Sequence, residues 1–343
     1  MEKNRREILL LDSLEIGYMA HGRRSRLLPA LSASAAGGEL VALIGRNGIG
    51  KSTLLRTVLG LQPGLGGRVI IKGKDIIKYS RSDMARLTGY ISTEIVRVAN
   101  MRVYNLVALG RFPHTNWIGS IDAESHKVIL ESIRRTGIAG LQNRLIMELS
   151  DGERQKSMIA RMIAQEAPIM VMDEPTAFLD IAARYDIINL LLDLTREGRT
   201  IVFSTHDINI AVNQADKIWL ILEDRLVEGS PEDLMLNGAF DHLFDSSAVR
   251  FNPADGNFTF IKQNHGEISV RGKGPVRLWT EKALIRAGFS VVDNQMSFCV
   301  EAFSGAYHRW IVRNGSQSEK FYSIYDLVNY LKKLHPPEPK YLR

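Results

Sequence analysis

A glycine-rich segment at residues 45–52, GRNGIGKS, has the residue types and the spacing of a phosphate-binding loop, G-x-x-x-x-G-K-[ST]. The glycines let backbone N–H groups turn toward phosphate oxygens, and the N-terminus of a following helix adds partial positive charge. Lys51 would reach the β- and γ-phosphates and Ser52 would hold Mg²⁺, whereas a glycine-rich turn without a ligand would need neither residue. The residues expected to contact the phosphates and the rest of the ligand are Gly45, Arg46, Asn47, Gly48, Ile49, Gly50, Lys51, Ser52 and Thr53.

Two adjacent carboxylates at the end of an apolar run could complete a site for hydrolysis. Asp173 and Glu174 lie in the segment IMVMDEP. Such a pair is costly to ionise at a buried strand end unless a cation is close, so we expect Asp173 to bind Mg²⁺. Glu174 could then act as the general base that polarises an attacking water. His206 follows the run TIVFST and could donate to the γ-phosphate, although a lone histidine is more often a surface residue.

The segment ELSDGE, residues 148–153, places two further carboxylates at the start of a helix expected to run through Ile163. The spacing S-x-x-E is that of a capping box, in which Ser150 accepts from the Glu153 amide and the Glu153 side chain reaches back. An acidic residue such as Asp151 also suits the positive end of the helix dipole. On local grounds this segment is a structural helix start.

Three apolar runs predict the elements that would position these side chains. Residues 39–44, 169–172 and 200–204 each read as a buried strand followed by a helical segment. This alternation is typical of a parallel sheet covered by helices, so the expected fold class is α/β. Residues 95–165 read as mainly helical and form a predicted helical subdomain.

The length of 343 residues suggests one large domain and one smaller domain. A hairpin at 217–228 and a helix capped by Ser230 close the first domain, which we place at residues 1–250. Residues 251–343 form an accessory domain that begins with a linker. Its expected elements are a strand at 268–270, a helix at about 280–287, strand-like stretches near 289–303 and 308–313, and a helix at 322–334.

The composition of the chain says more about its cellular compartment than about its binding partners. The sequence has neither an apolar stretch of membrane-spanning length nor a signal peptide's apolar core, so we expect a protein that stays in the cytosol. A single cysteine, Cys299, excludes an internal disulfide and a cysteine-based zinc site. The net charge is +6, and residues 251–343 hold 13 Lys and Arg against 8 Asp and Glu. This basic tail is either a solvated surface or a face for anionic lipid, nucleic acid or another protein.

The phosphate loop, LSDGE, MVMDEP, AFLD and STHD follow one another in an order that resembles the nucleotide-binding subunit of an ABC transporter, over roughly residues 5–245. The resemblance implies a P-loop NTPase fold, with a mixed sheet core and a helical subdomain. It also implies a homodimer that sandwiches ATP and Mg²⁺ between its subunits. In that family the helix after the LSDGE position binds the ATP of the opposite subunit, so Ser150, Asp151 and Gly152 would contact that nucleotide in trans.

The same resemblance assigns three more residues. Asp180, in AFLD, would lie in the loop that connects the two nucleotide sites, and His206 would be the switch histidine. Tyr18, in LEIGY, would stack on adenine.

Two departures from the family pattern affect these assignments. The usual LSGGQ appears as LSDGE, and we expect the Asp151 and Glu153 carboxylates to point away from ATP because like charges repel. The loop that usually reads Y-x-P-Q appears as GYISTEIV, so Thr93 stands at the glutamine position with Glu94 beside it. Either of these oxygen ligands could bind Mg²⁺.

Residues 103–119, VYNLVALGRFPHTNWIG, look like a stretch found in importers of iron-siderophore, haem and vitamin B12. A simpler interpretation is an amphipathic helix whose apolar face is core, with Arg111 as a surface ion-pair residue. Family members dock a membrane permease on this helical face. The resemblance therefore implies permease partners, an indirect link to a periplasmic or surface substrate-binding protein, and a peripheral location on the cytoplasmic face of the inner membrane.

The accessory domain has no counterpart in short members of this subfamily and resembles an added α+β domain. We expect its aromatic residues to lie in the core of the domain rather than to form a platform on which nucleic-acid bases stack. We therefore expect no nucleic-acid partner. Its role is either regulatory, dimer-stabilising or merely structural. The aromatic residues concerned are Trp279, Trp310, Tyr322 and Tyr325.

The leading hypothesis is an ATP-hydrolysing subunit that works as a homodimer and powers import of an iron chelate, haem or cobalamin. The alternative is a soluble ABC ATPase that acts on a macromolecular partner in assembly, repair or translation. Nucleotide sensing without turnover is disfavoured, because the residues for hydrolysis are all present, namely Lys51, Asp173, Glu174 and His206.

Overall fold

Two units divide the chain in this computed structural model, which describes residues 7–20, 23–93, 100–115, 120–244, 249–252, 257–260, 265–293, 296–305 and 307–334. The first unit comprises Met1–Ser246 and Phe251–Asn257, and the second comprises Ser247–Arg250 and Phe258–Arg343. Each unit has its own hydrophobic core. Among the helices of the described ranges, none combines the length and the apolar character that a membrane crossing requires.

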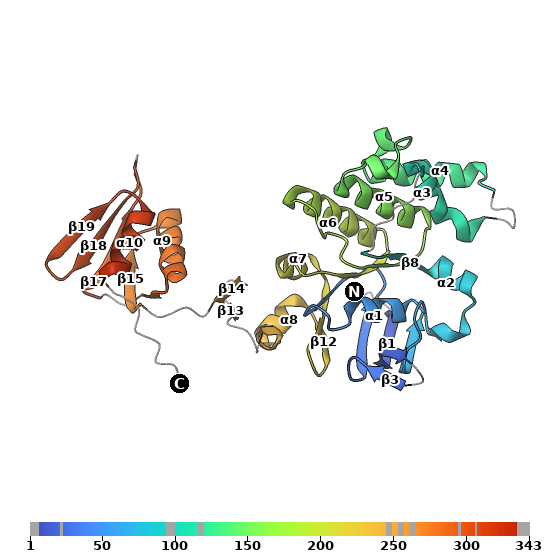
Figure 1. The fold of residues 1–343 in the computed structure, drawn as a ribbon, viewed down its shortest axis with the longest axis horizontal. Helices are drawn as coiled ribbons and strands as arrows, with labels where there is room; N and C mark the ends of the chain where they lie inside the picture. Colours follow the sequence, from blue (N-terminus) through green and yellow to red (C-terminus); the bar gives the residue numbers. More distant parts are fainter. Residues whose placement is uncertain are drawn as a thin grey trace, which may run out of the picture. The chain divides into compact units, whose positions relative to one another are not determined.

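A six-stranded sheet forms the centre of the first unit (Figure 1). Its strands are β5 Leu40–Gly45, β8 Thr88–Ile91, β9 Ile169–Met172, β10 Thr200–Ser204, β11 Lys217–Ile221 and β12 Leu226–Gly229. They lie in the order β12-β11-β5-β10-β9-β8, with only β12 antiparallel to its neighbour. The predicted strands and hairpin are confirmed within about one residue, because short apolar runs that are buried on both faces pair in parallel. The carboxyl ends of the five parallel strands therefore meet at one edge.

The first unit also contains a second, antiparallel sheet, whose strands come from the chain segments just before and just after β5. It contains β1 Glu7–Glu15, β4 Leu31–Ala36, β6 Gly66–Ile71 and β7 Lys74–Asp75 in the order β4-β1-β6-β7, and β2 Gly17–Ala20 pairs with β3 Arg23–Arg26 as a hairpin. No individual strand of this sheet was predicted. In β1 the segment EILLLDSLE lacks a clean alternation of apolar and polar residues, although Leu9 and Leu11 are the fully buried positions.

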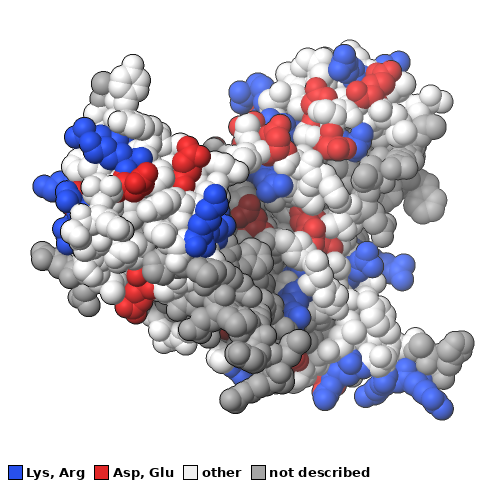
Figure 2. Space-filling view, turned by 60° about the vertical axis from the view of Figure 1, so that its left-hand side comes forward, with Lys and Arg blue, Asp and Glu red and all other residues white. Residues whose placement is uncertain are grey.

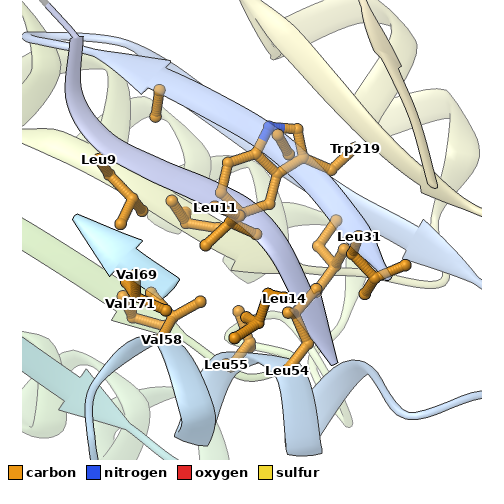
Figure 3. Packing of buried hydrophobic residues seen from close by; sticks show 14 of the residues in the cluster. Leu9, Leu11, Leu14, Leu31, Leu54, Leu55, Val58, Val69, Val171 and Trp219 are labelled. Carbon is orange, nitrogen blue, oxygen red and sulfur yellow. The ribbon is translucent and has the colours of Figure 1, made fainter. Parts of the chain in front are cut away.

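The core of the first unit lies between these two sheets and helix α1, Lys51–Val58 (Figure 3). Leu54 of α1 and Leu9 of β1 belong to this cluster together with Trp219 of β11. Trp219 is fully buried and donates from Nε1 to the Ser34 carbonyl at 3.1 Å. Because α1 begins at the last residues of the phosphate loop, this packing fixes the loop against the sheet.

Helices dominate the described part of residues 100–165. Helices α3 Val103–Ala108 and α4 Ala123–Arg135 both contact α5 Asp151–Ala164. Short 3₁₀ segments connect them: η2 Leu109–His114, η3 Ala139–Leu141 and η4 Ile146–Glu148. The helix predicted from the LSDGE start is confirmed as α5, and Figure 1 shows these helices grouped on one side of the six-stranded sheet.

Arg111 in η2 forms an ion pair, as the simpler interpretation expected, but it is an internal residue and the predicted surface position was wrong. Its side chain is buried, and its guanidinium donates to the Ala164 carbonyl at 2.9 Å and pairs with Glu166 at 2.5 Å. The charged group thus satisfies the carboxyl end of α5, where unpaired carbonyls need donors. The apolar side of α3 is core, as expected, through Val103, Leu106 and Val107.

The remaining helical segments of the first unit pack around its two sheets. They are η1 Ile76–Lys78, α2 Arg81–Leu87, α6 Ile181–Arg196, α7 Ile208–Gln214, α8 Pro231–Leu236 and η5 Asp241–Phe244. Helices α1 and α6 lie on opposite sides of the sheet in Figure 1, and both contact β5. The cap predicted at Ser230 is confirmed, since its hydroxyl accepts from the Asp233 amide at 3.1 Å.

The second unit is a five-stranded sheet with two helices. Its elements are β15 Glu267–Arg271, α9 Gly274–Ala287, β16 Ser290–Val292, β17 Phe298–Phe303, β18 Arg309–Asn314, β19 Gln317–Phe321 and α10 Ile324–Leu334, with the strand order β16-β15-β17-β18-β19. A separate two-stranded sheet pairs β13 Val249–Asn252 with β14 Asn257–Phe260. Helix α9 begins six residues before the predicted helix start at 280, and the stretch predicted at 289–303 divides into two strands.

The prediction that four aromatic residues form the core of this unit holds only for Trp310. Trp310 is 5% exposed and donates from Nε1 to the Thr280 hydroxyl at 2.7 Å. Trp279, Tyr322 and Tyr325 are 60%, 73% and 75% exposed. The buried residues of α9 are Val276, Thr280, Ala283, Leu284 and Ala287, and position 279 lies at the margin of the face that they form.

Some of the basic side chains in the described part of the second unit pair with carboxylates. Arg277 binds Glu281 at 2.5 Å and Asp293 at 2.8 Å, and Arg313 binds Glu301 at 2.9 Å. On the face drawn in Figure 2, lysine and arginine side chains stand in small groups among acidic ones.

Candidate nucleotide-binding and hydrolysis site

Most of the predicted site residues converge on the carboxyl edge of the six-stranded sheet. The phosphate loop leaves β5 there, Asp173 and Glu174 follow β9, and His206 follows β10. Ligands of open parallel sheets bind outside the carboxyl ends of the strands. The topology therefore brings these groups together although they are far apart in sequence.

The phosphate loop has the backbone that a phosphate cradle needs. Gly48 and Gly50 have φ angles of 76° and 112°, a region that other residues enter only with strain. Gly50 is the N-cap of α1 and provides no side-chain cap, so the first N–H groups of the helix are left for another acceptor. Arg46 in the same loop pairs with Glu223 at 2.7 Å.

Lys51 lies in the middle of the site and is 6% exposed. Its ammonium donates to the carbonyls of Gly45 at 2.9 Å and Arg46 at 3.3 Å. Burial lowers the pKa of Lys51, while the nearby charges of Glu174 and Asp173 act in the opposite direction. The Lys51 ammonium and these two carboxylates therefore lie close enough to attract one another. This is the arrangement expected if all three residues surround the phosphates of one nucleotide.

Asp173 is 2% exposed and has one oxygen bound and one oxygen free of protein partners. Its Oδ1 accepts from the Ser204 hydroxyl at 2.6 Å, and its Oδ2 has no hydrogen-bond partner. An unpartnered carboxylate oxygen in a buried position is unfavourable unless a cation binds it. Asp173 therefore fits the role of a Mg²⁺ ligand, and half-buried Ser52 in the first turn of α1 offers a second oxygen.

Glu174 and His206 are in direct contact. Glu174 Oε1 and His206 Nε2 lie 2.6 Å apart, with both side chains partly exposed. Glu174 has a φ of 51°, the left-handed region that is rarely occupied by residues other than glycine. The structure thus places a candidate general base beside the imidazole that would orient it.

Two further predicted residues lie at the rim of this site. The Tyr18 hydroxyl is 2.9 Å from the Thr53 hydroxyl in α1, and the tyrosine is half-exposed. Thr93 is exposed two residues after Ile91, whose carbonyl accepts from the Asp173 amide at 2.8 Å. Glu94, the other candidate for Mg²⁺, lies outside the described residues.

The LSDGE segment begins α5 with the predicted capping box. Glu153 N–H donates to the Ser150 hydroxyl at 3.3 Å, and the Glu153 carboxylate accepts from Ser150 N–H at 2.8 Å. Asp151 pairs with Arg154 at 2.7 Å. The Glu153 carboxylate also accepts from the Ser150 hydroxyl at 2.8 Å. These hydrogen bonds from the Ser150 amide and hydroxyl lower the pKa of Glu153, so it carries its charge close to Ser150.

The second group of predicted residues is built on α5 and α6. A side chain at Gly152 would lie 3.9 Å from Leu179 and 3.7 Å from Ala183, so the start of α5 lies beside the AFLD loop. Asp180 caps α6 by accepting from the Ala183 amide at 2.7 Å. The structure therefore brings Gly152 and the Asp180 loop together within one chain.

Ser204 is a site residue that the sequence analysis missed. It ends strand β10, and its hydroxyl also accepts from the Glu174 amide at 2.8 Å. The available signal in the sequence was a hydroxyl directly after the apolar residues 201–203.

Comparisons with known proteins agree with this geometry. Residues 28–177 match the family model described as ABC transporter, and residues 265–332 match the one described as iron ABC transporter C-terminal domain. The petrobactin import ATP-binding protein FpuC of Bacillus anthracis is 33% identical, with 74% of this chain and 93% of that protein covered. The ferric enterobactin transport ATP-binding protein FepC of Escherichia coli is 34% identical over 60% of this chain and 77% of that protein.

Among solved structures, a chain from an inward-facing ABC transporter of metal-chelate type superposes with a TM-score of 0.61 at 26% identity, covering 74% of this chain and 96% of that chain. The similarity therefore extends over most of the length of each of these relatives. The chain belongs to the family of ABC transporter ATP-binding proteins and is an ATP-binding, ATP-hydrolysing subunit.

Proposed function

We propose that two copies of this chain energise the uptake of an iron chelate through a membrane permease. The observation that best supports ATP hydrolysis is the Glu174–His206 contact of 2.6 Å, beside Lys51 and the unpartnered Asp173 Oδ2. Support for iron as the cargo comes from the ferric enterobactin relative and from the match of residues 265–332. Haem and cobalamin are the alternative cargoes, and the relatives do not favour a soluble ATPase with a macromolecular partner.

Hydrolysis at this edge would proceed by attack of water on the γ-phosphorus, which breaks its bond to the β–γ bridging oxygen and releases ADP and phosphate. Glu174 accepts the proton of the attacking water, and His206 holds the carboxylate in position. Lys51 and the N-terminus of α1 balance the phosphate charge. Mg²⁺ would be held by Asp173 and Ser52, with Thr93 as a further candidate, and would neutralise charge on the phosphates. Tyr18 would cover the adenine beside α1.

The second copy would supply the N-terminus of α5 to this nucleotide. This helix of 14 residues begins after Ser150, and the N–H groups of Asp151 and Gly152 in its first turn lie at its positive dipole end. The neighbouring Asp180 loop would link the two sites, since it lies against Gly152. ATP binding would close the dimer, and loss of the γ-phosphate would open it.

Glu153 should oppose this closure, because its carboxylate occupies the Ser150 groups that would face the partner's γ-phosphate. Glu153→Gln keeps an acceptor for the cap and removes the charge. We expect ATP-dependent dimerisation roughly two- to fivefold tighter, the size of one exposed charge pair. Analytical ultracentrifugation with ATP checks it, and Glu131→Gln, an exposed change on α4, is the control. Equal or weaker dimerisation by the Glu153→Gln chain would show that the carboxylate does not oppose the nucleotide.

The membrane assignment has a direct test. We propose that the subunit lies on the cytoplasmic face of the inner membrane, bound to permease subunits and linked through them to a substrate-binding protein. Purification of the native complex should recover an integral-membrane protein, and vesicles containing both should take up a ferric chelate only with internal ATP. Recovery of a soluble macromolecular partner instead would support the soluble-ATPase alternative.

We propose that residues 1–250 are the ATPase domain and that the rest is an accessory domain. The two cores share no residue, since one draws on β1, α1 and the central sheet and the other on β15, α9 and α10. A chain ending at Ser246 should therefore fold and retain measurable ATP hydrolysis. Circular dichroism melting and phosphate release check this. An unfolded or aggregated product would show that the second unit is needed for the stability of the first.

A further inference from the structure

Ser204 contacts both members of the carboxylate pair. It is the last residue of β10 and is fully buried. Its hydroxyl donates to Asp173 Oδ1 at 2.6 Å and accepts from the Glu174 N–H at 2.8 Å. One side chain thus bridges the residue expected to bind Mg²⁺ and the residue expected to act as the base.

The contact with Asp173 decides which of its oxygens is available. A distance of 2.6 Å lies in the range of strong hydrogen bonds from a hydroxyl to a charged carboxylate. Oδ1 is held, and Oδ2 is the oxygen without a partner. Without the hydroxyl, the buried carboxylate could rotate and offer either oxygen in more than one direction.

The contact with Glu174 supports a strained backbone. Glu174 has a φ of 51°, and such a conformation persists only where its surroundings hold it. The buried Ser204 hydroxyl accepts from the Glu174 N–H, while the partly exposed His206 binds the carboxylate. The base is therefore held at its backbone and at its tip.

We propose that Ser204 is a positioning residue that aims Asp173 Oδ2 at the Mg²⁺ of bound nucleotide and fixes the backbone of Glu174. This inference rests on the proposed function, because it requires Mg-ATP to bind beside Lys51. Partners that orient metal ligands typically contribute roughly 10- to 100-fold to metal affinity or activity. The hydroxyl acts through Asp173 and Glu174 and need not touch the substrate.

Calorimetric titration of the full chain with the non-hydrolysable analogue AMP-PNP separates this role from a structural one. The affinity of the Ser204→Ala chain for AMP-PNP in Mg²⁺ should be about tenfold or more below that of the wild-type chain. Its affinity for AMP-PNP in EDTA should stay within about twofold of the wild-type value. A merely structural residue would change both affinities together. Ser132→Ala is the matched control, because Ser132 on α4 is equally buried and donates to the Val128 carbonyl at 2.7 Å.

Ser204→Cys keeps the proposal testable if the alanine variant does not fold. A thiol fills nearly the same space but is a weak donor, so the Mg²⁺-dependent affinity should again fall while the affinity in EDTA is kept. Unchanged affinity in Mg²⁺ for a folded Ser204→Ala or Ser204→Cys chain would overturn the role of the hydroxyl. Failure of the wild-type chain to bind AMP-PNP with Mg²⁺ would instead overturn the proposed function.

Discussion

Replacement of Glu174 by glutamine should slow ATP hydrolysis by at least about 100-fold, the lower end of the contribution of a general base. An amide is as large as the carboxylate and can still bond to His206, but it cannot accept a proton from water at neutral pH. ATP should still bind with near wild-type affinity, since Lys51 and the phosphate loop are unchanged. Single-turnover phosphate release gives the rate, and a filter-binding assay gives the affinity.

The control for this variant is Glu131→Gln on α4, which also converts an exposed glutamate to an amide but lies in a simple ion pair with Arg134. It should hydrolyse ATP at the wild-type rate. Hydrolysis by the Glu174→Gln chain at an undiminished rate would refute the assignment of the base and leave the His206 contact without a catalytic purpose.

Replacement of Ser150 by arginine should abolish ATP-dependent dimerisation. The change removes the cap of α5 and places a long side chain where the partner's γ-phosphate would meet the first N–H groups of the helix. Light scattering with ATP, in chains that also carry Glu174→Gln so that ATP persists, should show a monomer. Folding of the monomer should survive, because loss of an N-cap costs only about 0.5–2 kcal/mol.

The variant Ser230→Arg distinguishes the loss of a helix cap from the loss of the contact with the partner's nucleotide. Ser230 caps α8 in the same way, accepting from the Asp233 amide, but α8 carries no predicted nucleotide residue. Both variants should lose similar stability in thermal melts, and only the change at Ser150 should lose the dimer. A normal dimer of Ser150→Arg chains would contradict the trans contact.

The features that the sequence predicted correctly are those whose cause is local. Apolar runs such as 169–172 and 200–204 form buried parallel strands wherever helices cover both faces, and a capping box such as Ser150 to Glu153 needs only four consecutive residues. The glycine-rich turn between β5 and α1 is equally local, since residues 45–51 are one continuous segment.

The features that were missed depend on pairing between distant segments. Strand β1 pairs with β4 and β6, and its own residues do not show which face is buried. The role of Ser204 depends on the parallel register of β10 and β9, which sets Phe203 opposite Met172. Trp279 was misplaced because its exposure depends on which residues of α9 face the sheet, a choice that the overall composition of the helix does not reveal.

The proposed function requires a nucleotide that is shared between two copies of the chain. Determination of the structure of Glu174→Gln chains with ATP and Mg²⁺, in a dimer that cross-linking shows to be the one formed in solution, tests this most directly. Ser150 and the Gly152 N–H should lie within hydrogen-bond distance of the γ-phosphate bound at the other copy's Lys51. A solution dimer in which residues 150–152 are remote from the neighbouring nucleotide would contradict it.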